Sequence, residues 1–272
     1  MTGGLGRKGW LLLPAAGFVT LFVAAPLLMT LQRSLLFQGA QPSGGNYARL
    51  IGDWFYIETA IHTLALSGAA TLITLVIGYP LAYLIARSGG WRKSLLIFLV
   101  VTPLLTNVVV RTFGWMIIFG RSGLLNSLLA AVGLPGLDLA HSWTAIAIAL
   151  VHVMLPFMVL SIASKLQTLD PNLEHAAATL GASRLRQFRH VVIPLSRDGI
   201  LTGCTLVFCL CMGSFVTVML MGDNSTLVLP ILIYQQLTVA SDWPLAAAIG
   251  IVLTATVVAF LAVQSSLIGA ER

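Results

Sequence analysis

The sequence predicts an all-α integral membrane protein with six transmembrane helices and with both termini in the cytoplasm. Of its 272 residues, 58% are hydrophobic and only 9% are charged, whereas soluble domains carry about 25% charged residues. Apolar runs long enough to span a bilayer recur along the chain and alternate with short polar segments. No linker or second soluble domain interrupts this pattern, so residues 1–272 are expected to form a single transmembrane domain.

The distribution of basic residues fixes the expected orientation. Eleven of the fifteen Lys and Arg residues fall in alternate segments, which the positive-inside rule assigns to the cytoplasm. The remaining four are Arg33, Arg49, Arg111 and Arg121. The net charge of +6 could also indicate nucleic-acid binding, but nucleic-acid binders gather their charge on one face or stripe. Membrane topology explains the distribution better, and no nucleic-acid partner is expected.

The six helices are expected at residues 10–31, 59–86, 94–119, 143–164, 199–221 and 243–267. Arg7 and Lys8 precede the first run, and Ala24-Ala25 could imitate a signal-peptide cleavage site. The run is too long for a signal-peptide core, so an uncleaved first helix is the preferred interpretation. Residues 32–58, 120–142 and 222–242 are expected outside the cell. Cysteines 204, 209 and 211 lie in one apolar run without metal-ligand spacing, so no metal site is expected.

The longest polar passage of the second half, about residues 165–198, is expected to form a cytoplasmic loop of two short helices. Asp170 can cap the first helix, with Pro171 at its first position. Gly181 can end that helix in the left-handed conformation, Ser183 can cap the second helix, and Pro194 is expected to stop it. One face of the first helix is apolar, with residues at i, i+3, i+4 and i+7: Leu173, Ala176, Ala177 and Leu180. This arrangement predicts a docking surface.

This loop resembles the "EAA" loop of permease subunits of binding-protein-dependent ABC importers. That pattern reads Glu-Ala-Ala, three residues, Gly, nine residues, Ile, any residue, Leu-Pro. The matching residues are Ala176, Ala177, Gly181 and Pro194, with Val191 and Ile193 as conservative replacements. His175 occupies the Glu position, and Glu174 lies one residue early. The resemblance implies coupling to an ATPase through Glu174, His175, Ala176, Ala177, Gly181, Ala182, Arg184 and Pro194.

Residues 107–126 and 221–247 also resemble polyamine-type permeases, and the likeness is greatest to the first permease of spermidine/putrescine-type importers. The resemblance implies a type I ABC importer permease in the bacterial inner membrane. It further implies a second homologous permease, two ATPase subunits and a periplasmic or lipid-anchored substrate-binding protein. ATP and Mg²⁺ are then expected on the ATPase, with no cofactor in this chain. The cargo implied is a polyamine, although related permeases carry aminophosphonates, ferric iron or other small solutes.

Three residues are candidates for the substrate path: Arg111, His152 and Glu58. Arg111 is ionisable at membrane depth, which points to function, yet it could also snorkel to the interface. His152 is more simply a packing histidine, and Glu58 could simply face water. No Asp or Glu lies inside a predicted helix core, although a dication is expected to meet carboxylates or aromatic faces. Either the path selects weakly, or a partner permease supplies acids, or the cargo is not a polyamine.

Enzymatic functions are not supported by the sequence. The chain lacks the GxxxxGK[ST] phosphate-binding loop and the HExxH and GxSxG patterns. ATP hydrolysis is therefore expected in a separate subunit. The alternative is a secondary transporter or channel that works without an ATPase, which would need coupling-ion ligands or broken helices in repeated positions. Membrane lipid is a further expected partner, because the basic residues of the loop could bind anionic head groups.

Overall fold

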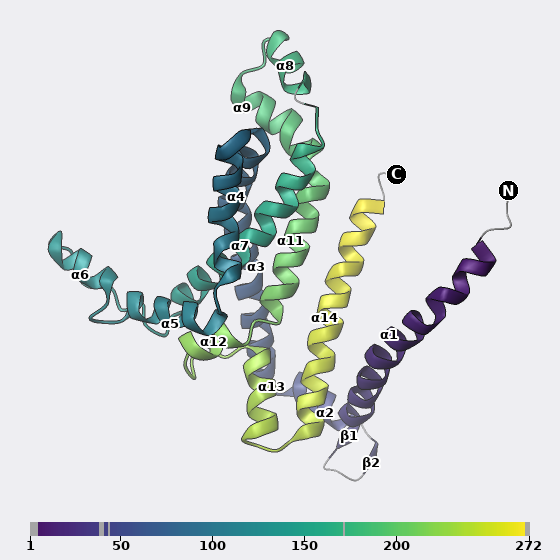
Figure 1. Cartoon of the computed structure of the whole chain (residues 1–272). Coiled ribbons are helices and arrows are strands. Elements are labelled where there is room, and N and C mark those ends of the chain that lie inside the picture. The colour runs from purple at the N-terminus through teal and green to yellow at the C-terminus, as the bar shows by residue number, and fades with distance from the viewer. Residues whose placement is uncertain (1–4, 38–40, 43, 171, 270–272) are drawn as a thin grey trace. The chain divides into compact units, whose positions relative to one another are not determined.

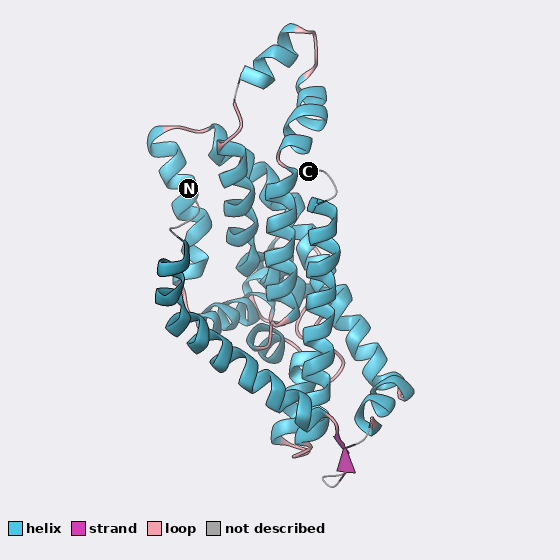
Figure 2. Cartoon of the chain, turned by 90° about the vertical axis from the view of Figure 1, so that its right-hand side faces the viewer, coloured by secondary structure: helices cyan, strands magenta, loops and turns pink. Residues whose placement is uncertain are grey.

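A computed structural model describes residues 5–37, 41–42, 44–170 and 172–269 of the chain (Figure 1). Most of these residues are helical. The only strands among them form one short antiparallel hairpin, β1 (Leu36–Phe37) with β2 (Gln41–Pro42) (Figure 2). The all-α prediction is therefore confirmed.

Five helical stretches among the described residues are long and apolar enough to cross a membrane. They are Gly17–Ser34, Trp54–Arg87, Val108–Ala131, Trp143–Gln167 and Trp243–Ser266. A bent pair, Arg184–Leu195 followed by Arg197–Met212, makes a sixth if the two helices count as one span. The predicted multi-span architecture is confirmed at five to six spans, while the cytoplasmic placement of both termini stays a prediction.

The chain divides into two compact units, which are described separately. The first comprises Met1–Glu58 and Leu232–Thr256, and the second comprises Thr59–Ile231 and Val257–Arg272. Two long helices, α3 (Trp54–Arg87) and α14 (Trp243–Gly269), contribute residues to both units. The single-domain organisation stays a prediction.

In the first unit, α1 (Leu5–Ser34) leads into the hairpin and α2 (Gly45–Gly52). The side-chain amide of Asn46 joins these elements, because its Nδ2 donates to the carbonyls of Ser34 (2.9 Å) and Leu36 (2.6 Å). The Ser34 hydroxyl also shares a 2.7 Å hydrogen bond with the Tyr47 hydroxyl. Residues 32–58, predicted as a loop, are thus largely structured.

In the second unit, α7 (Trp143–Gln167) forms the centre of the hydrophobic core and packs against α4 (Gly90–Leu105) and α11 (Arg197–Met212) (Figure 1). Its largest buried side chains are Ile146, Leu150, Met158, Ile162 and Leu166. α11 approaches α7 closely through glycines: a Cβ on Gly199 would lie 2.7 Å from Lys165 Cβ, and one on Gly203 would lie 2.8 Å from Met158 Sδ.

Two predicted helices are broken in the structure. The predicted helix 94–119 is divided into α4 and α5 (Val108–Phe119). Pro103 removes a backbone donor from the last turn of α4, and the Asn107 side chain caps α5 by accepting from Val109 N–H at 2.8 Å. The predicted helix 199–221 ends early at Met212 and resumes after Gly213 as α12 (Val216–Met221).

The remaining predicted helices are confirmed with longer bounds: 10–31 corresponds to α1, 59–86 to α3, 143–164 to α7 and 243–267 to α14. Two predicted loops contain helices of their own. Residues 120–142 include α6 (Leu124–Ala131), and residues 222–242 include α13 (Leu229–Thr238).

Candidate functional site

The predicted docking loop begins with α8 (Asn172–Thr179), which is capped at both ends. At its start the Asp170 carboxylate accepts a hydrogen bond from Asn172 N–H at 2.9 Å, as predicted. The predicted role of Pro171 lies outside the described residues. At its end Gly181 has φ +82°, and the predicted left-handed conformation is confirmed. Gly181 N–H donates to Ala178 O (2.9 Å) and Ala182 N–H to Ala177 O (3.0 Å), the paired bonds of a Schellman motif.

The second helical segment differs from its prediction in two respects. It runs through α9 (Arg184–Gln187), the π-helical segment η1 (Phe188–Val192) and α10 (Ile193–Leu195). Ser183 occupies the N-cap position, but its hydroxyl makes no capping bond; instead Gln187 Nε2 donates to Ala182 O at 2.7 Å.

Pro194 does not stop this segment, because helical backbone continues to Leu195 and then bends by 67° into α11. The wider π turn places Ile193 N–H on Phe188 O. In a regular α-helix the ring of a proline conflicts with the carbonyl four residues earlier. The wider π turn just before Pro194 lets the helical backbone continue through the proline.

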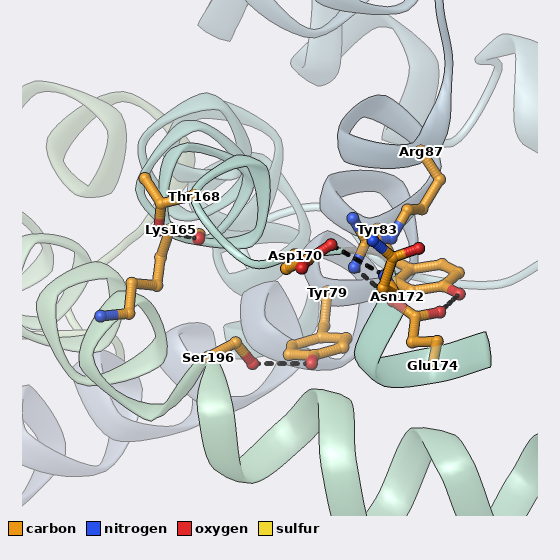
Figure 3. A network of polar contacts seen from close by, with 9 residues as sticks. All are labelled: Tyr79, Tyr83, Arg87, Lys165, Thr168, Asp170, Asn172, Glu174 and Ser196. Atoms are coloured by element: carbon orange, nitrogen blue, oxygen red, sulfur yellow. Dashed lines mark hydrogen bonds and ion pairs between the residues drawn. The ribbon is translucent and has the colours of Figure 1, made fainter. Parts of the chain in front are cut away.

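Glu174 fastens α8 to the end of α3. Its carboxylate accepts a 2.7 Å hydrogen bond from the Tyr83 hydroxyl and forms an ion pair with the Arg87 guanidinium (Figure 3). The side chains of Arg87 and Glu174 are only 22% and 18% exposed. Because the pair is shielded and charge-assisted, it holds α8 more firmly than a surface ion pair would.

Two further contacts join the loop to the same helix. The Phe188 ring meets Tyr79 and Tyr83 edge-on, with ring centroids 5.3 and 5.8 Å apart. The Tyr79 hydroxyl lies 2.8 Å from the Ser196 hydroxyl at the bend (Figure 3). α3 therefore contacts α8, η1 and the bend before α11.

The opposite side of α8 is open. Leu173 is 45% exposed and Leu180 88% exposed, and Ala176 is also exposed. A cleft of about 520 Å³ separates α8 from the following helical segment. It is lined by Tyr83, Glu174, His175, Ala178, Arg184, Gln187, Phe188 and Val192.

The structure brings most of the predicted coupling residues together. Glu174, His175 and Arg184 line one cleft, Ala177 and Ala182 bond across the glycine turn, and Pro194 lies at the far end of the segment. Their role in coupling stays a prediction. The sequence interpretation missed their partners on α3, namely Tyr79, Tyr83 and Arg87. Their spacing of four residues, which places them on one face of a helix, was an available signal.

The substrate-path candidates are not gathered at one place. Arg111 donates through Nη1 to the Pro103 carbonyl, which bridges the break between α4 and α5. His152 on α7 accepts a 3.3 Å hydrogen bond from Trp115 on α5. Glu58 is exposed and belongs to the first unit. Arg111 and His152 are thus engaged in contacts between neighbouring helices.

Five to six apolar spans among the described residues, together with a capped helix fastened to α3, are features expected of a transmembrane permease subunit. Residues 78–266 match the family described as "Binding-protein-dependent transport system inner membrane component". The chain belongs to this family and is a multi-pass protein of the inner membrane.

Two relatives have a similar length. The chain is 37% identical over 246 residues to the spermidine/putrescine transport system permease protein PotB of Escherichia coli (strain K12), covering 88% of this chain and 89% of that protein. It is 34% identical over 241 residues to PotB of Haemophilus influenzae, covering 86% and 84%. Among solved structures, a chain of a bacterial ABC transporter involved in the import of the acidic polysaccharide alginate aligns with a TM-score of 0.79 over 96% of each chain. At 17% identity, that likeness shows a common fold.

Proposed function

We propose that this chain and a second, non-identical permease form the path by which a binding-protein-dependent ABC importer carries spermidine, putrescine or a related small solute. The proposed cargo rests on the 37% identity to a spermidine/putrescine permease over 88% of the chain. Two ATPase subunits drive the cycle and hold ATP and Mg²⁺, while a periplasmic or lipid-anchored protein delivers the cargo. This chain holds no cofactor of its own in this proposal.

The loop supplies the coupling. The open face of α8, with Ala176 and Ala177, enters a groove on the ATPase, and small side chains permit close approach. The Schellman turn at Gly181 fixes the angle to α9, so the two helices move as one body. Glu174 and Phe188 pass that movement to α3 through Arg87, Tyr83 and Tyr79. ATP-driven closure then shifts the balance between outward- and inward-facing states.

Selection of the cargo rests mainly outside this chain. The five long described spans carry no carboxylate in their interior, and Glu58 lies only four residues after the start of α3. A polyamine dication crossing a membrane path is stabilised by carboxylates or aromatic faces. These groups are supplied by the second permease or by residues such as Trp115, while the binding protein chooses the cargo.

Uptake of labelled polyamine tests this proposal. Cells that lack their own polyamine uptake receive this chain with its partner permease, ATPases and binding protein. We expect saturable, ATP-dependent uptake of putrescine or spermidine that disappears when this chain alone is omitted. Aminophosphonate and ferric iron serve as alternative cargoes. Transport of one of these, with no polyamine uptake, would contradict the proposed polyamine cargo but would still agree with an importer function.

A further inference from the structure

Within α8 and the helical segment that follows it, the one carboxylate is directed away from the open surface. Glu174 is the only carboxylate among residues 172–197, and it is turned inward onto Arg87 and Tyr83 with 18% of its side chain exposed. Asp170, just before α8, is exposed and accepts a backbone hydrogen bond from Asn172. At the Glu position of the "EAA" pattern this chain has His175, which is exposed.

The outward groups of the same segment are basic. Arg184, Arg186 and Arg189 are all exposed, and within the described part of the chain none of the three forms an ion pair. Arg184 and His175 also line the cleft beside α8. Leu185, between two of these arginines, is 75% exposed. Between Asn172 and Arg197 the open surface therefore combines apolar side chains with positive charge, and no carboxylate of these residues is exposed.

We infer that this surface binds an acidic groove on the ATPase subunit, with Arg184, Arg186 and Arg189 facing carboxylates of that groove. The inference rests on the proposed function, because it names the chemistry of the surface that receives the loop. Complementary charge favours association and orients the partners, and unlike charges suppress incorrect partners.

A protein groove fits these residues better than a lipid surface does. Anionic head groups would satisfy the three arginines. They would not bury the apolar face of α8 or fill a cleft of about 520 Å³. In the second unit, α8 also lies beyond the ends of α4 and α7 (Figure 1). A shaped partner with both apolar and acidic residues meets all of these features.

Charge reversal tests the inference. The full complex is purified at matched membrane abundance with Arg184→Glu, Arg186→Glu, Arg189→Glu or all three, and retained ATPase is measured from low to high salt. Exposed ion pairs contribute little individually, so the loss of one pair is expected to reduce ATPase affinity by about 1.4- to 5-fold. The wild-type complex should weaken as salt rises, because screening acts on exposed charges. The triple variant should lose most of that salt dependence.

The matched control is Arg92→Glu, which reverses an exposed arginine on α4, outside the loop. It should retain the ATPase as the wild type does. An acidic-to-Lys change in the ATPase groove should restore binding to Arg186→Glu. If the triple variant retains the ATPase normally at every salt concentration, the inference is wrong. It is also wrong if the loss occurs only in vesicles containing phosphatidylglycerol and not in neutral lipid, because the arginines then bind lipid. If the wild-type chain retains no ATPase at all, the proposed function itself fails.

Discussion

Glu174 and His175 are adjacent in sequence but lie in different environments. The Glu174 carboxylate is shielded and paired, whereas the His175 side chain is exposed at the cleft. A shielded ion pair is costly to break on one side, because the remaining charge keeps its desolvation penalty without its partner. The identity of residue 174 should therefore affect the rigidity of the loop more than that of residue 175.

A double-mutant cycle on Glu174 and Arg87 tests this assignment. Arg87→Met leaves the Glu174 carboxylate with only Tyr83 as a partner, and we expect a loss of about 1–3 kcal/mol in the stability of the purified complex. The double variant Glu174→Gln with Arg87→Met should be less damaged than the sum of the single variants. Thermal inactivation in detergent is the measurement.

The control for that cycle is a second ion pair at the same end of the protein. Lys165 and Asp198 are 2.7 Å apart, but their side chains are 32% and 64% exposed. Such surface pairs contribute little, so Lys165→Met and Asp198→Asn should change stability only slightly. Strict additivity in the Glu174–Arg87 cycle would show that the two residues do not support each other.

At the scale of elements, α7 and α11 approach each other closely at two glycines of α11, Gly199 and Gly203. A Cβ on Gly199 would meet the Cβ of Lys165 at 2.7 Å, together with backbone atoms of Ser161 and Ile162. A Cβ on Gly203 meets mainly the flexible Met158 side chain. Small residues at such positions let membrane helices approach closely.

We therefore expect a graded series of glycine-to-alanine effects. Gly199→Ala should destabilise the protein by about 1–3 kcal/mol, because the neighbouring backbone cannot move aside. Gly203→Ala should cost less. Gly68→Ala on α3 is the control, since a Cβ there meets nothing within 4 Å, and it should be neutral or slightly stabilising. Membrane abundance and thermal midpoints provide the comparison, and equal effects at all three positions would contradict the packing account.

Sequence reasoning predicted elements that depend on local signals and failed where distant parts meet. The spacing from Ala176 to Gly181 predicted the turn, because a Schellman motif is a local structure. The break at Asn107 was missed because Pro103 is compatible with a continuous membrane helix when neighbours satisfy the backbone. The inward direction of Glu174 depends on Tyr83 and Arg87, which are 91 and 87 residues away. No pattern within the loop carries that information.

For the whole molecule, the orientation in the membrane follows from the charge distribution. Residues 184–190 are predicted to lie inside the cell and residues 222–242 outside. Val239 is 80% exposed and Arg186 is also exposed. A single cysteine at either position should therefore react with a thiol reagent that reaches it. The native cysteines 204, 209 and 211 are first replaced by alanine.

With an impermeant thiol reagent on intact cells, we expect Val239→Cys to be labelled and Arg186→Cys to be protected. Permeabilised cells should show labelling at both positions, which is the control for reactivity. Labelling of Arg186→Cys in intact cells would place the loop on the wrong side for an ATPase and would overturn the orientation.

The central claim is that the loop from Asp170 to Pro194 couples this permease to ATP hydrolysis. Its most direct test compares Ala177→Trp and Gly181→Val with wild type, at matched membrane abundance, for both uptake and retained ATPase. Trp at position 177 would overfill the proposed contact between α8 and the ATPase groove. Val at position 181 is strained at φ +82°, although its Cβ would meet nothing within 4 Å. Ser94→Trp, an exposed position on α4, is the control for bulk.

We predict that both loop variants insert into the membrane and bind the loaded substrate-binding protein. They should fail in ATP-dependent uptake, with the ATPase lost from the complex or its stimulated hydrolysis abolished, while Ser94→Trp transports normally. Normal transport by both loop variants with the ATPase retained would show that this loop is not the coupling element.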